Sequence, residues 1–138
     1  MGERSVVYDT NTIVSALGSD GSPQIALFIG FTRGWDMYFS EEILTEVERV
    51  MGYDKLPITE ETADLFLTIM RDEGIRVEPD VSVGASDDPD DNKFLECALE
   101  ADARYLVSGD RDLLDLDEFR GVDIVDASGF LDRQAEGI

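Results

Sequence analysis

The chain has 138 residues, of which 43% are hydrophobic, and it carries a formal net charge of -21 at pH 7. This length is typical of one domain with its own core, so we expect a single domain over residues 1–138 with its core at about 5–132. Histidine is absent, which excludes serine–histidine nucleophiles, histidine-ligated zinc and histidine-based RNA cleavage; any catalysis has to use carboxylates.

Short β-type runs alternate with longer helix-type segments along the chain, which predicts a mostly parallel α/β sheet. Residues that favour N-caps mark several helix starts. In chain order, the predicted elements are a strand at 5–8, a helix at 10–17, a helix capped by Ser22 with Pro23 in first position, a strand at 36–39, a helix capped by Ser40, a helix that starts after Thr59 and stops near Gly74, a strand at 75–77, a helix opened by the acidic loop 87–91, strands at 104–107 and 122–125, and a short helix from Ser128.

Acidic and polar residues gather where predicted strands end. The segments 9–11, 87–91 and 108–112 stand at such places, and Glu46 lies beside the apolar stripe of a helix. In open α/β sheets, ligands bind beyond the carboxyl ends of the strands. Each segment has a plain alternative, because Asp and Asn often cap helices and charged runs usually face solvent. Together, separate carboxylates suit Mg²⁺ or Mn²⁺, whereas zinc or iron would favour histidine or thiolate.

Four segments follow one another along the chain: Asp9-Thr10-Asn11 after a hydrophobic strand, Glu46 within the segment 40–46, the segment 88–94, and the segment 107–114 that contains Ser-Gly-Asp-Arg-Asp. In this order, they resemble the PIN-domain ribonucleases. The resemblance covers about residues 6–131. It implies a three-layer α/β/α fold with a five-stranded parallel sheet in the order 3-2-1-4-5.

The resemblance also implies a metal-dependent endoribonuclease that hydrolyses single-stranded or structured RNA with Mg²⁺ or Mn²⁺. The implied catalytic residues and metal ligands are Asp9, Glu46, Asp91 and Asp110, with Asp112 replacing or assisting Asp110. Asn11 and Ser108 match supporting polar positions, and Ser108 stands where family members usually have threonine.

Other polar residues near these positions receive lesser roles. Arg111 and Lys93 are candidates for RNA binding, as are Arg33 and Arg49, although solvated pairing with nearby acids is the alternative for each. The remaining acids of this region are interpreted as loop, cap, supporting or solvated residues: Asp87, Asp88, Asp90 and Glu96.

Three functional alternatives remain open from the sequence. Small proteins of this family are often toxins that form homodimers and are neutralised by an antitoxin, and the alternative to this role is an RNA-processing or decay nuclease. A second alternative is a non-catalytic module that binds RNA or protein. A third is a haloacid-dehalogenase-type phosphatase, whose nucleophile and metal loops are faintly similar to Asp9-Thr10-Asn11-Thr12 and to Gly109-Asp110 with Asp115. Against it, Asn11 stands where a second Asp is expected, and the chain is too short for the usual cap domain.

The charge distribution predicts the environment of the protein. Acidic residues are spread over most of the chain, and only Lys55 and Lys93 are lysines, a pattern that suggests adaptation to molar salt, where charges are screened within about 3 Å. At low salt the same charge would oppose RNA binding. No run of apolar residues approaches the roughly 20 that a membrane span requires, and no basic and apolar leader is visible, so we expect a cytoplasmic protein without a membrane partner.

Overall fold

The computed structural model describes residues 4–53, 55–84 and 88–137. Within them, the strands are β1 (Ser5–Tyr8), β2 (Asp36–Phe39), β3 (Ile75–Arg76), β4 (Tyr105–Val107), β5 (Glu118–Phe119) and β6 (Val122–Val125). The helices are α1 (Thr10–Gly18), α2 (Ser22–Thr32), α3 (Glu41–Met51), α4 (Glu60–Glu73), the 3₁₀ turn η1 (Pro89–Asp91), α5 (Asn92–Ala101), α6 (Arg111–Leu114) and α7 (Ala127–Ala135).

The described strands form one sheet in the order β3-β2-β1-β4-β6-β5. Every neighbouring pair is parallel except β5 and β6. The predicted parallel sheet and its order are therefore confirmed, with β6 as the fifth parallel strand. The two-residue strand β5 was not predicted; it folds back antiparallel on β6 through a turn in which Arg120 and Gly121 both have positive φ.

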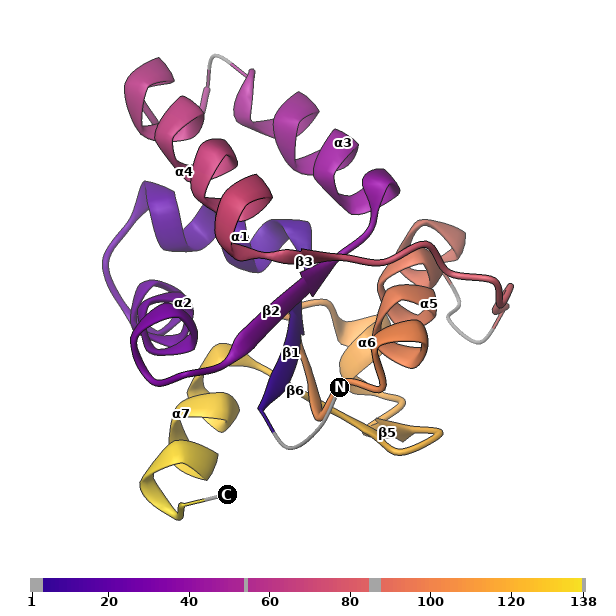
Figure 1. The fold of residues 1–138 in the computed structure, drawn as a ribbon. Helices are drawn as coiled ribbons and strands as arrows, with labels where there is room; N and C mark the ends of the chain where they lie inside the picture. Colours follow the sequence, from indigo (N-terminus) through magenta and orange to yellow (C-terminus); the bar gives the residue numbers. More distant parts are fainter. Residues whose placement is uncertain (1–3, 54, 85–87, 138) are drawn as a thin grey trace.

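Helices cover both faces of the sheet, as Figure 1 shows. On one face α5 packs against β1, β2 and β4. On the other, α2 contacts β2, and α7 contacts β4 and β6, while α1 packs against α2 and α3. This arrangement is the predicted three-layer α/β/α fold, and it leaves the carboxyl ends of β1 and β4 to carry polar side chains.

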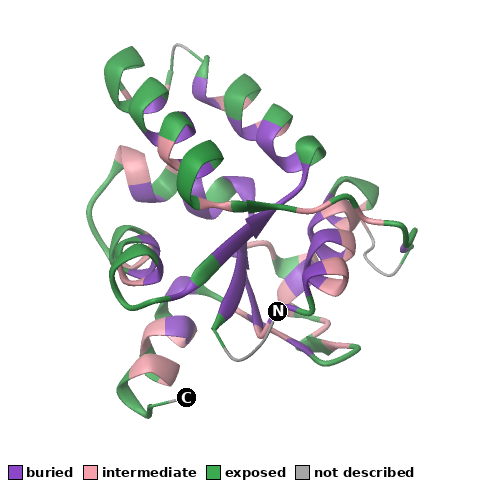
Figure 2. Cartoon of the chain, in the orientation of Figure 1, coloured by how far each residue is buried: buried purple, intermediate pink, exposed green. Residues whose placement is uncertain are grey.

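The centre of the sheet is buried on both faces (Figure 2). The side chains of β1 and β4 are almost completely inaccessible, as expected for parallel strands covered by helices on both sides. Trp35, Tyr105 and Phe130 pack edge-on or tilted with ring centroids 5.2–5.6 Å apart. A rigid central sheet of this kind holds the residues at its strand ends in fixed positions.

Side-chain caps explain where several helices begin. Ser40 and Thr59 accept hydrogen bonds from backbone N–H groups in the first turns of α3 and α4, as predicted. Ser22, by contrast, is the first residue of α2, and Gly21 occupies the N-cap with φ 127° and without a side-chain hydrogen bond. The C-terminal helix begins at Ala127 with Asp126 as its cap, one residue before the predicted start. In the described part of the chain, no helix has the length and apolar character needed to cross a bilayer.

Candidate active site

Two polar residues meet where β1 and β4 end. These strands are parallel neighbours with Tyr8 aligned to Val107, so the next residues, Asp9 and Ser108, lie side by side. Ser108 Oγ donates a hydrogen bond of 2.6 Å to Asp9 Oδ2, and Asp9 N donates one of 3.0 Å to Val107 O. Both side chains are buried. The sequence predicted this pairing in outline, because both residues follow strands of one sheet edge.

The Asp9 carboxylate is fixed by the start of α1. Its Oδ1 accepts a 2.8 Å hydrogen bond from Thr12 N, which makes Asp9 the N-cap of the helix. Burial raises the pKa of Asp9 above its ordinary value; hydrogen bonds from Ser108 and Thr12 act in the opposite direction, and the nearby Asp110 raises the pKa further. A cation close to Asp9 would stabilise its ionised form.

Ser108 extends the connection to Asp110. The Ser108 Oγ accepts a 3.0 Å hydrogen bond from Asp110 N, and Asp110 Oδ1 accepts one of 2.8 Å from Asp112 N. Asp110 therefore caps α6, a one-turn helix that was not predicted. Asp112 contributes its backbone N–H to this arrangement, whereas Asn11 and Arg111 are exposed beside it.

Three carboxylates converge next to this chain of hydrogen bonds. Asp88, Asp91 and Asp110 each have an oxygen within 4.8 Å of an oxygen of the other two, and we call them the carboxylate cluster. Asp91 is only 7% exposed. Like charges at this separation raise each other's energy unless a cation neutralises them, and the all-oxygen donor set fits the preference of Mg²⁺ and Mn²⁺.

The cluster shares Asp91 and Asp110 with the predicted ligand set, adds Asp88, and does not include Asp9, Glu46 or Asp112. Asp88 was interpreted as a loop or cap residue, and it does cap η1 by accepting a 3.0 Å hydrogen bond from Asp90 N. Its carboxylate nevertheless joins Asp91 and Asp110, a role that the sequence did not reveal because neighbouring acids in one loop look alike. Asp87 lies outside the described residues. Asp9 is not among the three, but it is linked to Asp110 through Ser108.

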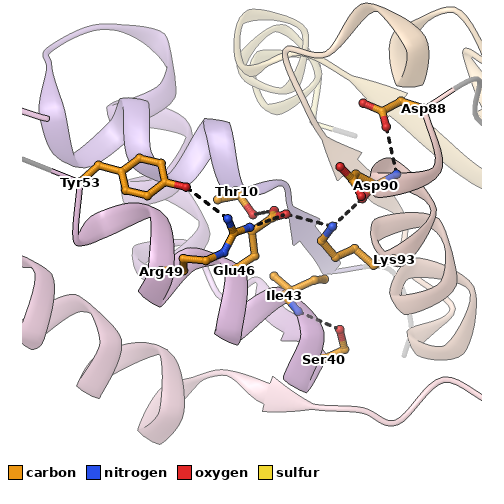
Figure 3. A network of polar contacts seen from close by, with 9 residues as sticks. All are labelled: Thr10, Ser40, Ile43, Glu46, Arg49, Tyr53, Asp88, Asp90 and Lys93. Atoms are coloured by element: carbon orange, nitrogen blue, oxygen red, sulfur yellow. Dashed lines mark hydrogen bonds and ion pairs between the residues drawn. The ribbon is translucent and has the colours of Figure 1, made fainter. Parts of the chain in front are cut away.

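Glu46 lies in a separate network with cations around it (Figure 3). Thr10 Oγ1 donates a hydrogen bond to Glu46 Oε1, and Lys93 Nζ lies 3.0 Å from Glu46 Oε2. Arg49 is 3.9 Å from the same oxygen. We call these four residues the Glu46 network. Thr10 was not assigned a role from the sequence, since only the packing of α1 against α3 brings it to Glu46.

Lys93 joins the Glu46 network to the loop that carries the carboxylate cluster. Its ammonium group donates a 2.6 Å hydrogen bond to Asp90 O, and its side chain is only 12% exposed. The structure thus places this predicted RNA-binding residue in an ion pair with Glu46. Glu96, on the next turn of α5, accepts a 2.9 Å hydrogen bond from Val83 N and so holds the backbone at Val83 against the helix.

A pocket of about 430 Å³ opens beside Asp110. Its wall is formed largely by the first turns of three helices, through Asn11 and Thr12 of α1, Ser22 and Pro23 of α2, and Ala127 and Ser128 of α7. Helix N-termini carry partial positive charge and favour phosphate groups. Carboxylates already cap two of these N-termini, Asp9 on α1 and Asp126 on α7, which leaves the N-terminus of α2, without a side-chain cap, as the one that could face an anion.

Comparisons with known proteins agree with this arrangement. Residues 5–112, most of the chain, match a family model described as PIN domain. A protein of Methanocaldococcus jannaschii named "Uncharacterized protein MJ1680" is 33% identical over 115 residues, which cover 80% of this chain and 74% of that protein. The family match includes the segments that carry Asp9, Glu46, Asp91 and Asp110.

Proposed function

The chain belongs to the PIN-domain family, whose members are typically nucleases, and on this basis we propose that it is a metal-dependent endoribonuclease. The observation that carries the proposal is the convergence of Asp88, Asp91 and Asp110 beside Asp9 at the carboxyl ends of β1 and β4. These carboxylates come from segments far apart in the chain, and their close approach serves no core packing. A nuclease that lacks histidine needs such a group of acids.

Each acid receives a role from its surroundings. Asp91 and Asp110, with Asp88, would hold Mg²⁺ or Mn²⁺, while Asp9 lies next to them with both oxygens fixed by hydrogen bonds. Such a cation makes water more acidic and stabilises negative charge on a phosphate. Glu46 remains a proposed catalytic residue, and Asp112 a proposed alternative ligand; Lys93 balances the Glu46 charge in this structure.

The proposed path of RNA follows the pocket beside Asp110. The N-terminus of α2, which has no side-chain cap, lies in its wall and favours a phosphate group, and Asn11 offers an exposed polar side chain there. Arg111 is exposed at the start of α6, directly after Asp110, and is the proposed cationic contact. The proposed substrate class is RNA, as membership of the family implies, bound largely through its backbone.

Cleavage of a mixed single-stranded RNA in multimolar KCl tests the proposal. With Mn²⁺ or Mg²⁺, the wild-type protein should produce fragments with 5′-phosphate and 3′-hydroxyl ends, and a chelator should stop the reaction. Asp9→Asn should slow cleavage by about 100-fold or more, because it removes a charge from the site. Asp72→Asn, on the exposed side of α4, is the matched control and should cleave normally.

The same proteins distinguish the alternatives. Metal binding without any cleavage would contradict the nuclease and favour a non-catalytic binding module. A haloacid-dehalogenase-type phosphatase would need Asp115 at the site, yet Asp115 is exposed where α6 ends. For the proposed toxin role, growth arrest on induced expression should disappear with Asp9→Asn; unaffected growth would favour an RNA-processing nuclease.

We also propose a homodimer, for which α2 offers a suitable face. Ile25, Phe28 and Phe31 are 49%, 65% and 37% exposed on this helix. The helix contains no charged residue, so α2 itself would bring no charged side chain into a contact between two copies. Sedimentation in multimolar KCl should report a dimer that Phe28→Glu dissociates; a wild-type monomer would contradict the proposal.

A further inference from the structure

A larger pocket, of about 800 Å³, lies at the opposite end of the sheet from the carboxylate cluster. Arg4, Trp35 and Arg104 each stand immediately before a strand, namely β1, β2 and β4. Because these strands are parallel, their N-terminal ends meet at one edge. Arg33 from the end of α2 and Gln134 from α7 complete the polar part of the wall. We call this the arginine pocket.

The arginine pocket concentrates positive charge in a chain that has little of it. Three of the 11 basic residues line the pocket, and its lining contains no Asp or Glu. Across residues 4–53, 55–84 and 88–137, no carboxylate forms an ion pair with Arg4, Arg33 or Arg104. Three guanidinium groups from separate segments, with no ion pair to a carboxylate in the described part of the chain, fit an anion with more than one negative charge.

Contacts other than ion pairs hold the side chains of Arg4 and Arg104. The Arg4 guanidinium lies 5.7 Å from the Trp35 ring centroid and donates a 2.9 Å hydrogen bond to Arg33 O. The Arg104 guanidinium lies 5.5 Å from the Tyr105 ring centroid, and its buried Nε has no hydrogen-bond partner among the described residues. Stacking thus positions the Arg4 and Arg104 charges at the pocket.

The rest of the pocket is suited to the body of a small ligand. Ile29, Trp35 and Leu131 supply apolar surface, and Trp35 Nε1 donates a 3.1 Å hydrogen bond to Gln134 Oε1, which orients the indole. The volume lies within the range of about 300–1,000 Å³ that is typical of small-molecule sites. A ligand with a compact anionic end and a flat, partly apolar end would use both walls.

We propose that the arginine pocket binds a nucleoside monophosphate group, with its phosphate on the arginines and its nucleoside against the apolar wall. The group can come from a free nucleotide or from the phosphorylated end of an RNA. The pocket shares no lining residue with the carboxylate cluster, so binding does not depend on the proposed cleavage activity. If the ligand is the phosphorylated end of an RNA, the inference concerns the substrate of the proposed nuclease and rests on that proposed function.

Fluorescence gives a direct test, because Trp35 is the only tryptophan of the chain and lines the pocket. Titration of the full-length protein with 5′-AMP, in the presence of a chelator, should change the emission saturably. Arg33→Gln and Arg104→Gln should each weaken binding by roughly 10-fold, since each removes a charged donor to the phosphate. Arg71→Gln removes the same charge from an exposed pair with Glu48 and should leave the affinity unchanged.

Parallel titrations identify the source and the limits of the proposal. The phosphorylated end of an RNA is the ligand if a short RNA with a 5′-phosphate binds more tightly than 5′-AMP and more tightly than the same RNA with a 5′-hydroxyl. A free nucleotide is the ligand if 5′-AMP binds more tightly than the RNA. Adenosine should bind poorly. Three results would overturn the proposal. The first is inorganic phosphate or oligoglutamate binding as tightly as 5′-AMP, the second is no fluorescence response to 5′-AMP, and the third is an unchanged affinity in both arginine variants. Retained 5′-AMP binding in Asp9→Asn separates this result from failure of the nuclease.

Discussion

At the scale of single residues, the site depends on how a buried carboxylate is kept in place. Asp9 is 3% exposed, and a buried charge needs hydrogen bonds or a cation to offset its loss of hydration. Ser108 and Thr12 supply the hydrogen bonds. Ser108 also holds the backbone of Asp110, so one hydroxyl aligns acids from two strand ends.

The Ser108 hydroxyl should therefore be required for activity. Ser108→Ala leaves Asp9 Oδ2 and Asp110 N without this partner, and we expect metal affinity and cleavage to fall by about 10- to 100-fold. Ser108→Thr keeps the hydroxyl and should retain most of the activity. Cleavage rates across a Mn²⁺ titration measure the effect, with Ser19→Ala at an exposed position as the control. An equal loss in the Thr and Ala variants would show that the hydroxyl is not the cause.

The sequence does not show which acids of the loop 87–91 belong to the carboxylate cluster. Four acids occur within residues 87–91, and their carboxylates differ only through the turn they adopt. The 3₁₀ turn η1 buries Asp91 and brings Asp88 to the same place. Local sequence does not encode which acid faces Asp110, because that depends on how η1 and β4 are positioned relative to each other.

At the scale of secondary-structure elements, an ion pair joins α3 and α5 near the site. The Glu46 and Lys93 side chains are 19% and 12% exposed, so solvent screens their attraction less than that of a surface pair. Lys93 additionally donates to Asp90 O at the beginning of α5. The ion pair thus connects α3 to α5, two helices that are far apart in the sequence.

A double-mutant cycle should measure this connection. We expect Glu46→Gln and Lys93→Met each to lower the free energy of unfolding, with a coupling of roughly 1–2 kcal/mol between them. The matched control is Glu48 and Arg71, whose side chains are 56% and 48% exposed and whose coupling should stay below about 1 kcal/mol. Urea unfolding of all variants in the same salt provides the values. A coupling no larger for Glu46 and Lys93 than for the control would contradict this interpretation.

At the scale of the whole molecule, the net charge of -21 dominates. Most of these acids face solvent, and at low ionic strength their mutual repulsion destabilises the folded chain more than the expanded unfolded one. The Debye length falls from about 10 Å at 0.1 M to about 3 Å at 1 M salt. Concentrated salt should therefore restore stability without any change in the fold.

Thermal unfolding across a KCl series tests this proposed adaptation to high salt. We expect Tm to rise steadily into the multimolar range, by roughly 3–5 °C for each kcal/mol regained in a chain of this size. Sucrose is the control, since it favours compact states by exclusion but does not screen charge. Equal Tm and solubility at low and multimolar KCl would contradict adaptation to salt.

The sequence by itself determined the sheet order, most strands and helices, and the places where acids would gather. The sheet order was implied by the resemblance to a known family. The elements and the positions of the acids follow from local rules: apolar periodicity, N-cap residues, and the fact that parallel strands end on one edge. The helix α6, the strand β5 and the start of α2 were missed because four-residue or shorter elements and glycine caps leave weak patterns.

Only the tertiary structure decided which polar groups meet. In the structure, Asp88 lies with Asp91 and Asp110, and Glu46 lies between Thr10 and Lys93. Arg33, which was predicted near an edge of the site, lies in the arginine pocket at the other end of the sheet. These meetings depend on the packing of α1, α3 and η1 and on which end of the sheet each loop reaches. Distances between segments far apart in the chain arise from that packing, and no local pattern of residues records them.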